Sequence, residues 1–291
     1  MTKKSHLALA LVVAMSASTV GARAFDQSRY PDLRGQWVSV GVRPDAPWDP
    51  TRPSGRGQQA PLTPEYQAIF EATLARHAER GQPPASCLPP GMPRSMIVYR
   101  PMEVIVMPNA TYIVLGHMSE LRRIFTDGRK WPEPIDTAYL GYSIGTWEDA
   151  DGDGRFHTLA VETRGMKGER TFDSSGIPLH RDNQTVVKER IGLDRSDPNL
   201  LRDEITTIDH ALTRPWTVNR TYRRERKAEW DEVVCSESNR NITIGTETYW
   251  TLHSRHTITF LFAKSVVHIN APMFTEVALK YFYNWGSGDE H

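Results

Sequence analysis

Five charged or titratable side chains in the middle of the chain are suited to acid–base chemistry: Arg123, Asp127, Glu162, His180 and Glu189. His180 follows segment 173–178, a stretch with Gly and Pro that predicts a loop, and histidine exchanges protons readily near neutral pH. Arg123 and Asp127 end a stretch of alternating charge, where a planar guanidinium is suited to bind a carboxylate or an enolate oxygen. The alternatives are an exposed loop histidine and ion pairing on the surface.

Glu162 and Glu189 fall within stretches that read as strands, where alternate residues point to opposite faces. Their parity separates them from apolar neighbours such as Leu159 and Val161, so we expect both carboxylates to share the face that does not join the core. If that face lines a polar lumen, its carboxylates suit acid–base chemistry. If it is the outer face, they are solvated charges, and we slightly favour this second interpretation.

Three further side chains are predicted to contact a bound molecule: Trp37, His117 and Tyr142. His117 lies on an apolar strand close to Glu120, where an imidazole is suited to pair with an arginine or to act as a base. The alternative is an interior histidine held by hydrogen bonds.

Segment 149–154 places Asp149, Asp151 and Asp153 on alternating residues before a glycine. Three such carboxylates can wrap Ca²⁺, which prefers oxygen ligands. An EF-hand loop needs Glu at its twelfth position, which is Ala160 here, and the flanks read as strands. The candidate is therefore a structural Ca²⁺ site, and the favoured alternative is an acidic hairpin loop.

The N-terminus has the three parts of a signal peptide. Lys3 and Lys4 precede an apolar stretch at 7–20, and Ala22-Arg23-Ala24 follows as a cleavage pattern. A membrane-spanning helix needs roughly 20 apolar residues, and the stretch is shorter. We expect cleavage after residue 24 and a mature protein, periplasmic or secreted, with no membrane span. The alternatives are a buried N-terminal helix and a retained anchor.

The chain has two cysteines, Cys87 and Cys235. In an oxidising compartment two distant cysteines are most simply one disulfide, which would stabilise the fold by roughly 4–5 kcal/mol. Lys plus Arg and Asp plus Glu are equal at 35 each, which argues against nucleic acid as a partner. Nucleotide-binding, nucleophile-elbow and zinc-protease motifs are missing from the sequence, and we expect no cofactor apart from the candidate Ca²⁺.

The elements that must position these residues are mainly strands. Thr63-Pro64-Glu65 predicts the start of one helix, which Gly81 ends. Short strands joined by turns then predict an antiparallel meander that closes into a barrel. These strands are expected at 102–107, 111–118, 121–126, 140–147, 156–163, 185–191, 200–208 and 216–223.

We divide the chain into a signal peptide at 1–24, an N-terminal part at 25–94, the meander at 95–241 and a C-terminal segment at 242–291. In the C-terminal segment, 257–262 and 264–269 read as strands and 273–283 as a helix.

Gly35-x-Trp37 resembles the first strand of lipocalin-like barrels, in which the Trp plugs one end. Over residues 32–240 the series D-L-x-G-x-W, L-T-P-E-Y, C-x-P-x-G-x-P-R, R-R-I-x-T-D-G-R, G-x-S-I-G-x-W-E, G-I-P-x-H and V-C-x-E-x-N resembles a large family of exported bacterial proteins, most without an assigned function. The resemblance implies a secreted β-rich domain and paired cysteines. The chain departs from it in the lengthened turn at 149–154 and in the last fifty residues.

Taken together, the sequence predicts a mainly β protein, a lipocalin-like antiparallel barrel or curled meander with one accessory helix. It would enclose a small, largely apolar or aromatic molecule and is a candidate for a cofactor-free isomerase or lyase. The alternatives are a binding or carrier protein without catalysis and an interaction protein of the cell envelope.

Overall fold

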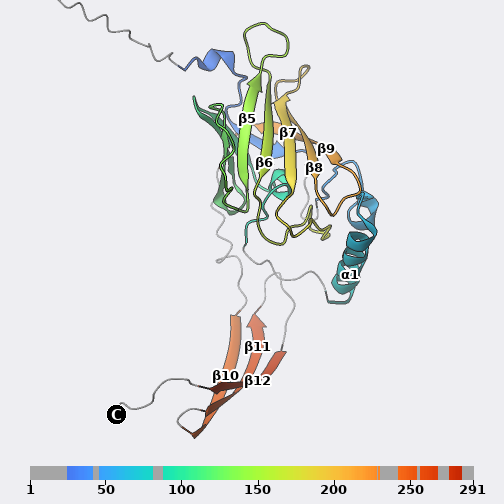
Figure 1. Cartoon of the computed structure of the whole chain (residues 1–291), viewed down its shortest axis with the longest axis vertical. Coiled ribbons are helices and arrows are strands. Elements are labelled where there is room, and N and C mark those ends of the chain that lie inside the picture. The colour runs from blue at the N-terminus through green and yellow to red at the C-terminus, as the bar shows by residue number, and fades with distance from the viewer. Residues whose placement is uncertain are drawn as a thin grey trace, which may run out of the picture.

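Nine strands close into one barrel in sequence order, which confirms the mainly β barrel (Figure 1). The computed structural model describes residues 25–41, 46–80, 88–227, 229, 242–253, 256–267 and 275–283. The barrel strands are β1 (Gln36–Ser39), β2 (Met102–Val106), β3 (Ala110–Leu115), β4 (Glu120–Phe125), β5 (Tyr142–Glu148), β6 (Thr158–Arg164), β7 (Val186–Leu193), β8 (Leu200–Ile208) and β9 (Trp216–Glu225).

Pairing between β1 and β9 closes the barrel, with Trp37 opposite Arg224. Every neighbouring pair is antiparallel except β4 and β5, which run parallel, with Ile124 opposite Ser143. The prediction of an uninterrupted antiparallel meander was therefore wrong at this pair. The turn at Asp127-Gly128 does not form a hairpin; instead, segment 126–141 carries the chain back along the barrel before β5 begins.

The one α-helix of the described residues, α1 (Pro64–Arg80), begins where the sequence predicts. The Thr63 carbonyl accepts a hydrogen bond from the Gln67 N–H, and Pro64 occupies the first helical position, where a missing N–H costs nothing. Its apolar stripe, with Tyr66 and Phe70, is buried. No helix among the described residues is both long and apolar enough to cross a membrane.

The C-terminal segment forms a separate antiparallel sheet of β10 (Ile242–His253), β11 (His256–Val267) and β12 (Thr275–Tyr283). The helix expected at 273–283 is wrong, because 275–283 pairs along its whole length with β11. The sequence of β12 is rich in β-branched and aromatic residues, which favour strands. Residues 257–262 and 264–267 of the two expected strands belong to the single strand β11, and 268–269 lie outside the described residues. The signal peptide, Cys87 and Cys235 lie outside the described residues.

Two short segments fill one end of the barrel, the end at which α1 lies. They are the 3-10 helix η3 (Arg94–Ile97) and the loop 46–48. Together we call these two segments the plug. The plug side chains Trp48, Met96 and Ile97 are fully buried. At β1 Trp37 is also fully buried; its Nε1 donates to the Leu33 carbonyl at 3.0 Å.

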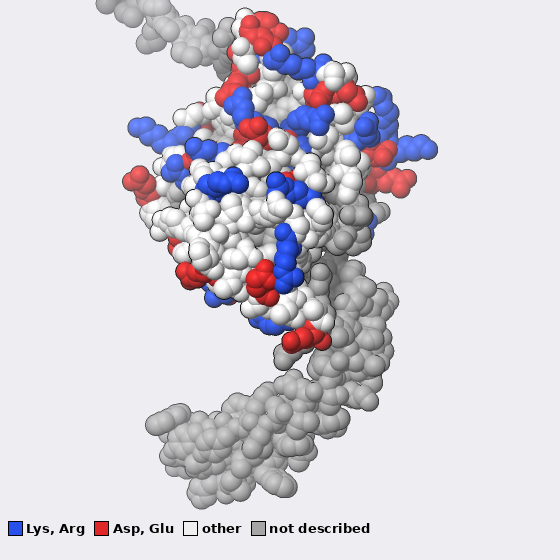
Figure 2. Space-filling model, turned by 90° about the vertical axis from the view of Figure 1, so that its right-hand side faces the viewer, with Lys and Arg blue, Asp and Glu red and all other residues white. Residues whose placement is uncertain are grey.

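Positive and negative side chains are interspersed over the face of the barrel in Figure 2, as the equal charge counts of the sequence lead one to expect.

We expect Trp37→Ala to lower the free energy of unfolding by about 3–5 kcal/mol, because it removes a large, fully buried ring from the core. Urea unfolding followed by circular dichroism measures this change. The matched control is Leu121→Ala on the outer face of β4, which is expected to change stability by less than about 1 kcal/mol. Equal losses for the two variants would contradict the buried position of Trp37.

Candidate functional site

Charged side chains point into the barrel from four strands. Alternation along each strand sends every second residue inward, and in each of β4, β7, β8 and β9 a fully buried charge occupies one of these inward positions. The four residues are at most 2% exposed, and they define the candidate site, which we call the interior cluster: Arg122, Glu189, Asp203 and Arg220. Charged residues are almost never buried to this extent without a partner, so each needs an explanation.

Arg122 and Glu189 are buried as an ion pair, and each compensates the charge of the other. The guanidinium binds the carboxylate through both nitrogens, with Nη1 2.8 Å from Oε1 and Nη2 in contact with Oε2. Nη2 also donates to the Thr163 hydroxyl at 3.0 Å, and this hydroxyl lies 2.8 Å from that of Ser143. A bidentate pair with further hydrogen bonds is the geometry in which attraction offsets the desolvation of both charges.

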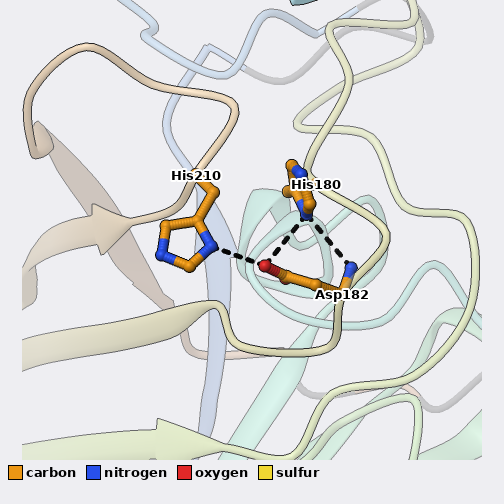
Figure 3. Close-up of side chains that lie close together, drawn as sticks. All are labelled: His180, Asp182 and His210. Atoms are coloured by element: carbon orange, nitrogen blue, oxygen red, sulfur yellow. Dashed lines mark hydrogen bonds and ion pairs between the residues drawn. The ribbon is translucent and has the colours of Figure 1, made fainter.

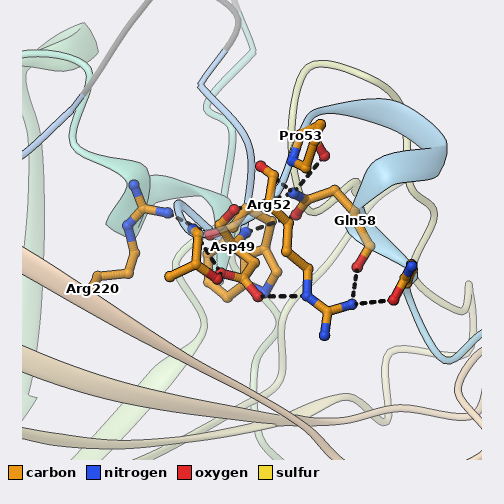
Figure 4. A network of polar contacts seen from close by, with 8 residues as sticks. Asp49, Arg52, Pro53, Gln58 and Arg220 are labelled. Carbon is orange, nitrogen blue, oxygen red and sulfur yellow. Dashed lines mark hydrogen bonds and ion pairs between the residues drawn. The ribbon is translucent and has the colours of Figure 1, made fainter.

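Arg220 holds the plug. Its Nη1 donates to the Trp48 carbonyl at 2.6 Å and to the Pro47 carbonyl at 3.3 Å (Figure 4). The loop beyond Trp48 is held together by Gln58, whose amide accepts from the Asp49 N–H at 2.7 Å and donates to the Pro53 carbonyl at 3.0 Å. Arg220 therefore fastens a compact loop to the barrel wall.

For Asp203, no hydrogen-bond partner among the described residues accounts for the burial of its carboxyl group. Both of its carboxyl oxygens are buried and lack a hydrogen-bond partner within the described residues. Burial raises the pKa of this carboxyl well above its usual range, and the negative charge of Glu189 raises it further. The positive charges of Arg122 and Arg220 offset part of this rise. An unsatisfied buried polar group costs about 1–3 kcal/mol of stability. The two carboxyl oxygens of Asp203 are therefore available for hydrogen bonds with a bound molecule.

Other buried polar atoms in the described part of the chain also lack a partner, and three of them belong to the strands that carry the cluster: Nε of Arg122, Nε of Arg220 and the hydroxyl oxygen of Thr207. The two Nε–H groups are donors, and Asp203 can donate when protonated and accept in either state. The unsatisfied groups of the interior cluster thus include both donors and acceptors.

Glu120 lies on the same inward face of β4, two residues before Arg122. Its carboxylate accepts a hydrogen bond from the Ser95 hydroxyl of the plug at 3.4 Å. Burial raises the pKa of Glu120 to about 7, although the bond from Ser95 acts in the opposite direction. A carboxyl that titrates near neutral pH is suited to general acid–base work, and this one sits where the plug meets the barrel.

Of the residues predicted from the sequence, the structure brings Glu189 alone into the interior cluster. The expectation that Glu162 and Glu189 share a face is wrong, because the register of β6 and β7 places Glu162 opposite Lys188 and Val161 opposite Glu189. Glu162 therefore lies on the outer face, where Arg164 Nε donates to it at 2.6 Å.

Arg123, Asp127 and Tyr142 gather on the outer surface near the end of β4. The Arg123 guanidinium lies over the rings of Tyr112 and Phe125, and Asp127 pairs with Arg129 at 2.6 Å. Arg129 Nη1 also donates to the Tyr142 hydroxyl at 3.3 Å. The inward arginine of β4 is thus Arg122, one residue before the predicted one.

The remaining candidates lie apart from the interior cluster. Trp37 is part of the core beside Leu33. His117 belongs to η4 (His117–Ser119) and packs against the ring of Tyr99. Burial lowers the pKa of His117, and the charges of two arginines lower it further. His180 lies in the β6–β7 connection, 3.0 Å from an Asp182 oxygen.

The three carboxylates of the acidic turn are engaged in hydrogen bonds and an ion pair with neighbouring residues. Asp149 accepts from the Gly154 N–H at 2.9 Å, Asp153 accepts from the Arg155 N–H at 2.8 Å, and Asp151 pairs with Arg195 at 3.2 Å. Asp149 and Asp153 converge with His157, whereas Asp151 is not part of this group. The three predicted Ca²⁺ ligands therefore do not converge as one set.

An open depression of about 490 Å³ lies on the outer face of β5 to β8. Its charged side chains include Glu162 and Arg190, which are held in ion pairs with neighbouring residues.

Comparison with known proteins yields no match to a family model, to a curated protein or to a solved structure. The resemblance to lipocalin-like barrels and to exported bacterial proteins stays a prediction.

We expect Glu120→Gln to remove a pH dependence from stability. Because the pKa of Glu120 is about 7 in the fold and 4.5 ordinarily, its proton is bound more tightly in the folded state, and the free energy of unfolding falls as pH rises from 4.5 to 7. The variant should be more stable than the parent above pH 7, by at most about 3 kcal/mol, and nearly equal to it below pH 4.5.

Urea unfolding between pH 4 and pH 8 (about one measurement per half unit) tests this. The control is Glu169→Gln, an exposed glutamate paired with Arg181. Parallel stability curves for Glu120→Gln and the parent would show that the Glu120 carboxyl is not shifted.

Proposed function

We propose that the mature protein acts outside the cytoplasm and encloses a small, largely apolar molecule in its barrel, on which it performs cofactor-free acid–base chemistry such as an isomerisation or an elimination. The single observation that carries this proposal is the Asp203 carboxyl, buried with both oxygens unpartnered among the described residues.

The inward residues next to Asp203 are apolar, which favours a ligand that is largely apolar. The inward neighbours of Asp203 on β8 are Leu201 and Ile205, and Ile191 and Val218 face inward from the strands on either side. Polar atoms without a partner among the described residues lie on the same strands and include Nε of Arg122, Nε of Arg220 and the Thr207 hydroxyl. A ligand with an apolar frame and one oxygen-bearing group matches this distribution, because the group would satisfy the unpaired donors.

The chemistry follows from the charges that face Asp203. As a carboxylate, Asp203 can take a proton from a carbon of the ligand, and as the resulting carboxylic acid it can return that proton to another carbon of the same ligand, so that no proton is gained or lost overall; burial raises the pKa of Asp203, which makes the carboxylate a stronger base. The unpaired Nε–H of Arg122 is a donor for the oxygen on which negative charge develops. Glu189 fixes the Arg122 guanidinium, so this donor is oriented before the ligand arrives.

A ligand would enter at the plugged end. Val98, which follows η3, has a φ of 55°, a left-handed conformation that β-branched residues rarely adopt. Met118 and Ser119, in the β3–β4 connection, also have positive φ. Strained backbone at the edges of the plug marks the positions where a change of conformation would relieve the strain.

A carrier without catalysis is the second candidate, and a specific observation favours it. Glu189 is fully engaged by Arg122, and Arg220 holds the plug, so Asp203 is the one member of the interior cluster without a partner. The unpaired polar atoms would bind a ligand equally well if no proton moved.

Native mass spectrometry of the protein purified from its own extracytoplasmic fraction tests the proposal. We expect the parent to retain one small molecule and Asp203→Asn to lose it or to bind it at least about 10-fold more weakly, since one good hydrogen bond to a buried group is worth about 1.4 kcal/mol or more. The control is Glu162→Gln on the outer face, which should retain the molecule.

The released molecule then separates catalysis from transport. Incubated in D₂O with the parent protein, it should exchange a carbon-bound proton for deuterium, whereas Asp203→Asn should give no exchange above background. Binding without exchange would identify a carrier. Retention of the molecule by Asp203→Asn at full occupancy would refute the interior site.

Export is tested separately, by N-terminal sequencing. The protein recovered from the extracytoplasmic fraction is expected to begin at Phe25, after the Ala22-Arg23-Ala24 pattern. A chain that begins at Met1, or one confined to the cytoplasm, would contradict export.

A further inference from the structure

Two connections meet at the plugged end of the barrel and bring three potential metal ligands together. His180 and Asp182 lie between β6 and β7, and His210 lies between β8 and β9 (Figure 3). Both strands that precede these connections run in the same direction, so the connections emerge at one end. One ligand atom from each of the three side chains lies within 4.8 Å of the other two.

The Asp182 carboxylate stands between the two imidazoles. Its Oδ2 lies 3.0 Å from Nδ1 of His180 and 2.5 Å from Nδ1 of His210 (Figure 3). Ligand atoms that share one tetrahedral zinc ion at 2.0–2.1 Å stand about 3.4 Å apart, so the two nitrogens and the oxygen need only a small outward movement to surround an ion.

Nδ1 of His180 faces two polar groups of Asp182. The backbone N–H of Asp182 lies 3.2 Å from this nitrogen, and the carboxylate Oδ2 lies 3.0 Å from it. A ring nitrogen and a carboxylate oxygen at this distance share either a proton or a metal ion, and a metal ion that binds here takes the place of the proton.

A buried carboxylate holds the two connections in place. Asp209, next to His210, accepts from the His180 N–H at 2.9 Å and from the Ala211 N–H at 2.8 Å. Its other oxygen accepts from the Thr185 hydroxyl at 2.5 Å. The backbone of His180 is therefore fixed to the segment that carries His210, which positions the ligands before any ion binds.

We propose that His180, Asp182 and His210 form a binding site for a divalent transition-metal ion of the zinc type. Two imidazoles and one carboxylate form the donor set of open zinc sites, in which solvent or substrate takes the remaining position. His210 is 64% exposed, so that position faces water. The bound ion would join the β6–β7 and β8–β9 connections at the mouth of the barrel. This site is distinct from the interior cluster and does not depend on the function proposed for it.

Zinc binding to the mature protein, produced without a polyhistidine tag and stripped with a chelator, tests this site by isothermal titration calorimetry. We expect one Zn²⁺ per chain in the parent. His210→Ala and Asp182→Asn should each weaken binding by on the order of 100-fold, because each removes one of three ligands. Co²⁺ added in place of Zn²⁺ should give visible ligand-field absorption that is lost in both variants.

The control is His157→Ala, in the group formed with Asp149 and Asp153 at the opposite end of the barrel. It should leave the zinc affinity and the Co²⁺ spectrum unchanged. His210 is exposed, so its replacement is expected to leave the circular dichroism spectrum as it is. No zinc binding by the parent, equal affinity in His210→Ala, or a loss that follows His157→Ala instead would each overturn the site.

Discussion

The buried pair of Arg122 and Glu189 is the interaction on which the inside of this barrel depends. Neither charge is reachable by water, so each is tolerated only while the other is in place. The pair joins β4 to β7 across the interior, since these strands are not neighbours in the sheet. Arg122 also contacts the Met96 sulfur, so the same guanidinium fixes the position of the plug. Loss of one partner would therefore disturb the strand positions, the plug and the field around Asp203 together.

Polar contacts between β9 and the plug close one end of the barrel. Arg220 and Tyr222 on β9 bind plug carbonyls, with the Tyr222 hydroxyl donating to Met96 at 2.7 Å. These contacts use ordinary polar side chains to close a barrel that would otherwise be open at this end. Asp203 is buried beside apolar side chains and two positive charges, and charges interact strongly in surroundings of low polarity.

The sequence predicted the barrel well because its signals are local. Turn residues and period-two alternation place the strands, and Thr63-Pro64 places the start of α1. The parallel β4–β5 pair and the strand at 275–283 were missed, because pairing with a distant strand decided them. For the site, Glu189 was identified, but the arginine chosen from the β4 stretch was Arg123, whereas the inward arginine is Arg122. A shift of one residue reverses the face of a strand.

Two signals in the sequence were available for the missed residues. Asp203 stands at the same parity as Leu201 and Ile205, and Arg220 at that of Val218 and Tyr222, so each breaks an otherwise apolar inward row. A charge in an apolar row predicts a buried polar group once the strand is known to face a core. The grouping of His180 with His210 had no such signal, because it depends on how two connections meet in space.

The β1–β9 pairing has a consequence for how the molecule is made. The strand that closes the barrel against β1 is the last of the nine to be synthesised, and Arg224 also binds the carbonyls of Arg34 and Asp32 near the other end of the barrel sequence. Contacts of such long sequence separation form late and slowly. The chain therefore stays open until nearly all of the barrel sequence is available, and closure of the barrel reports that the whole barrel sequence has been made.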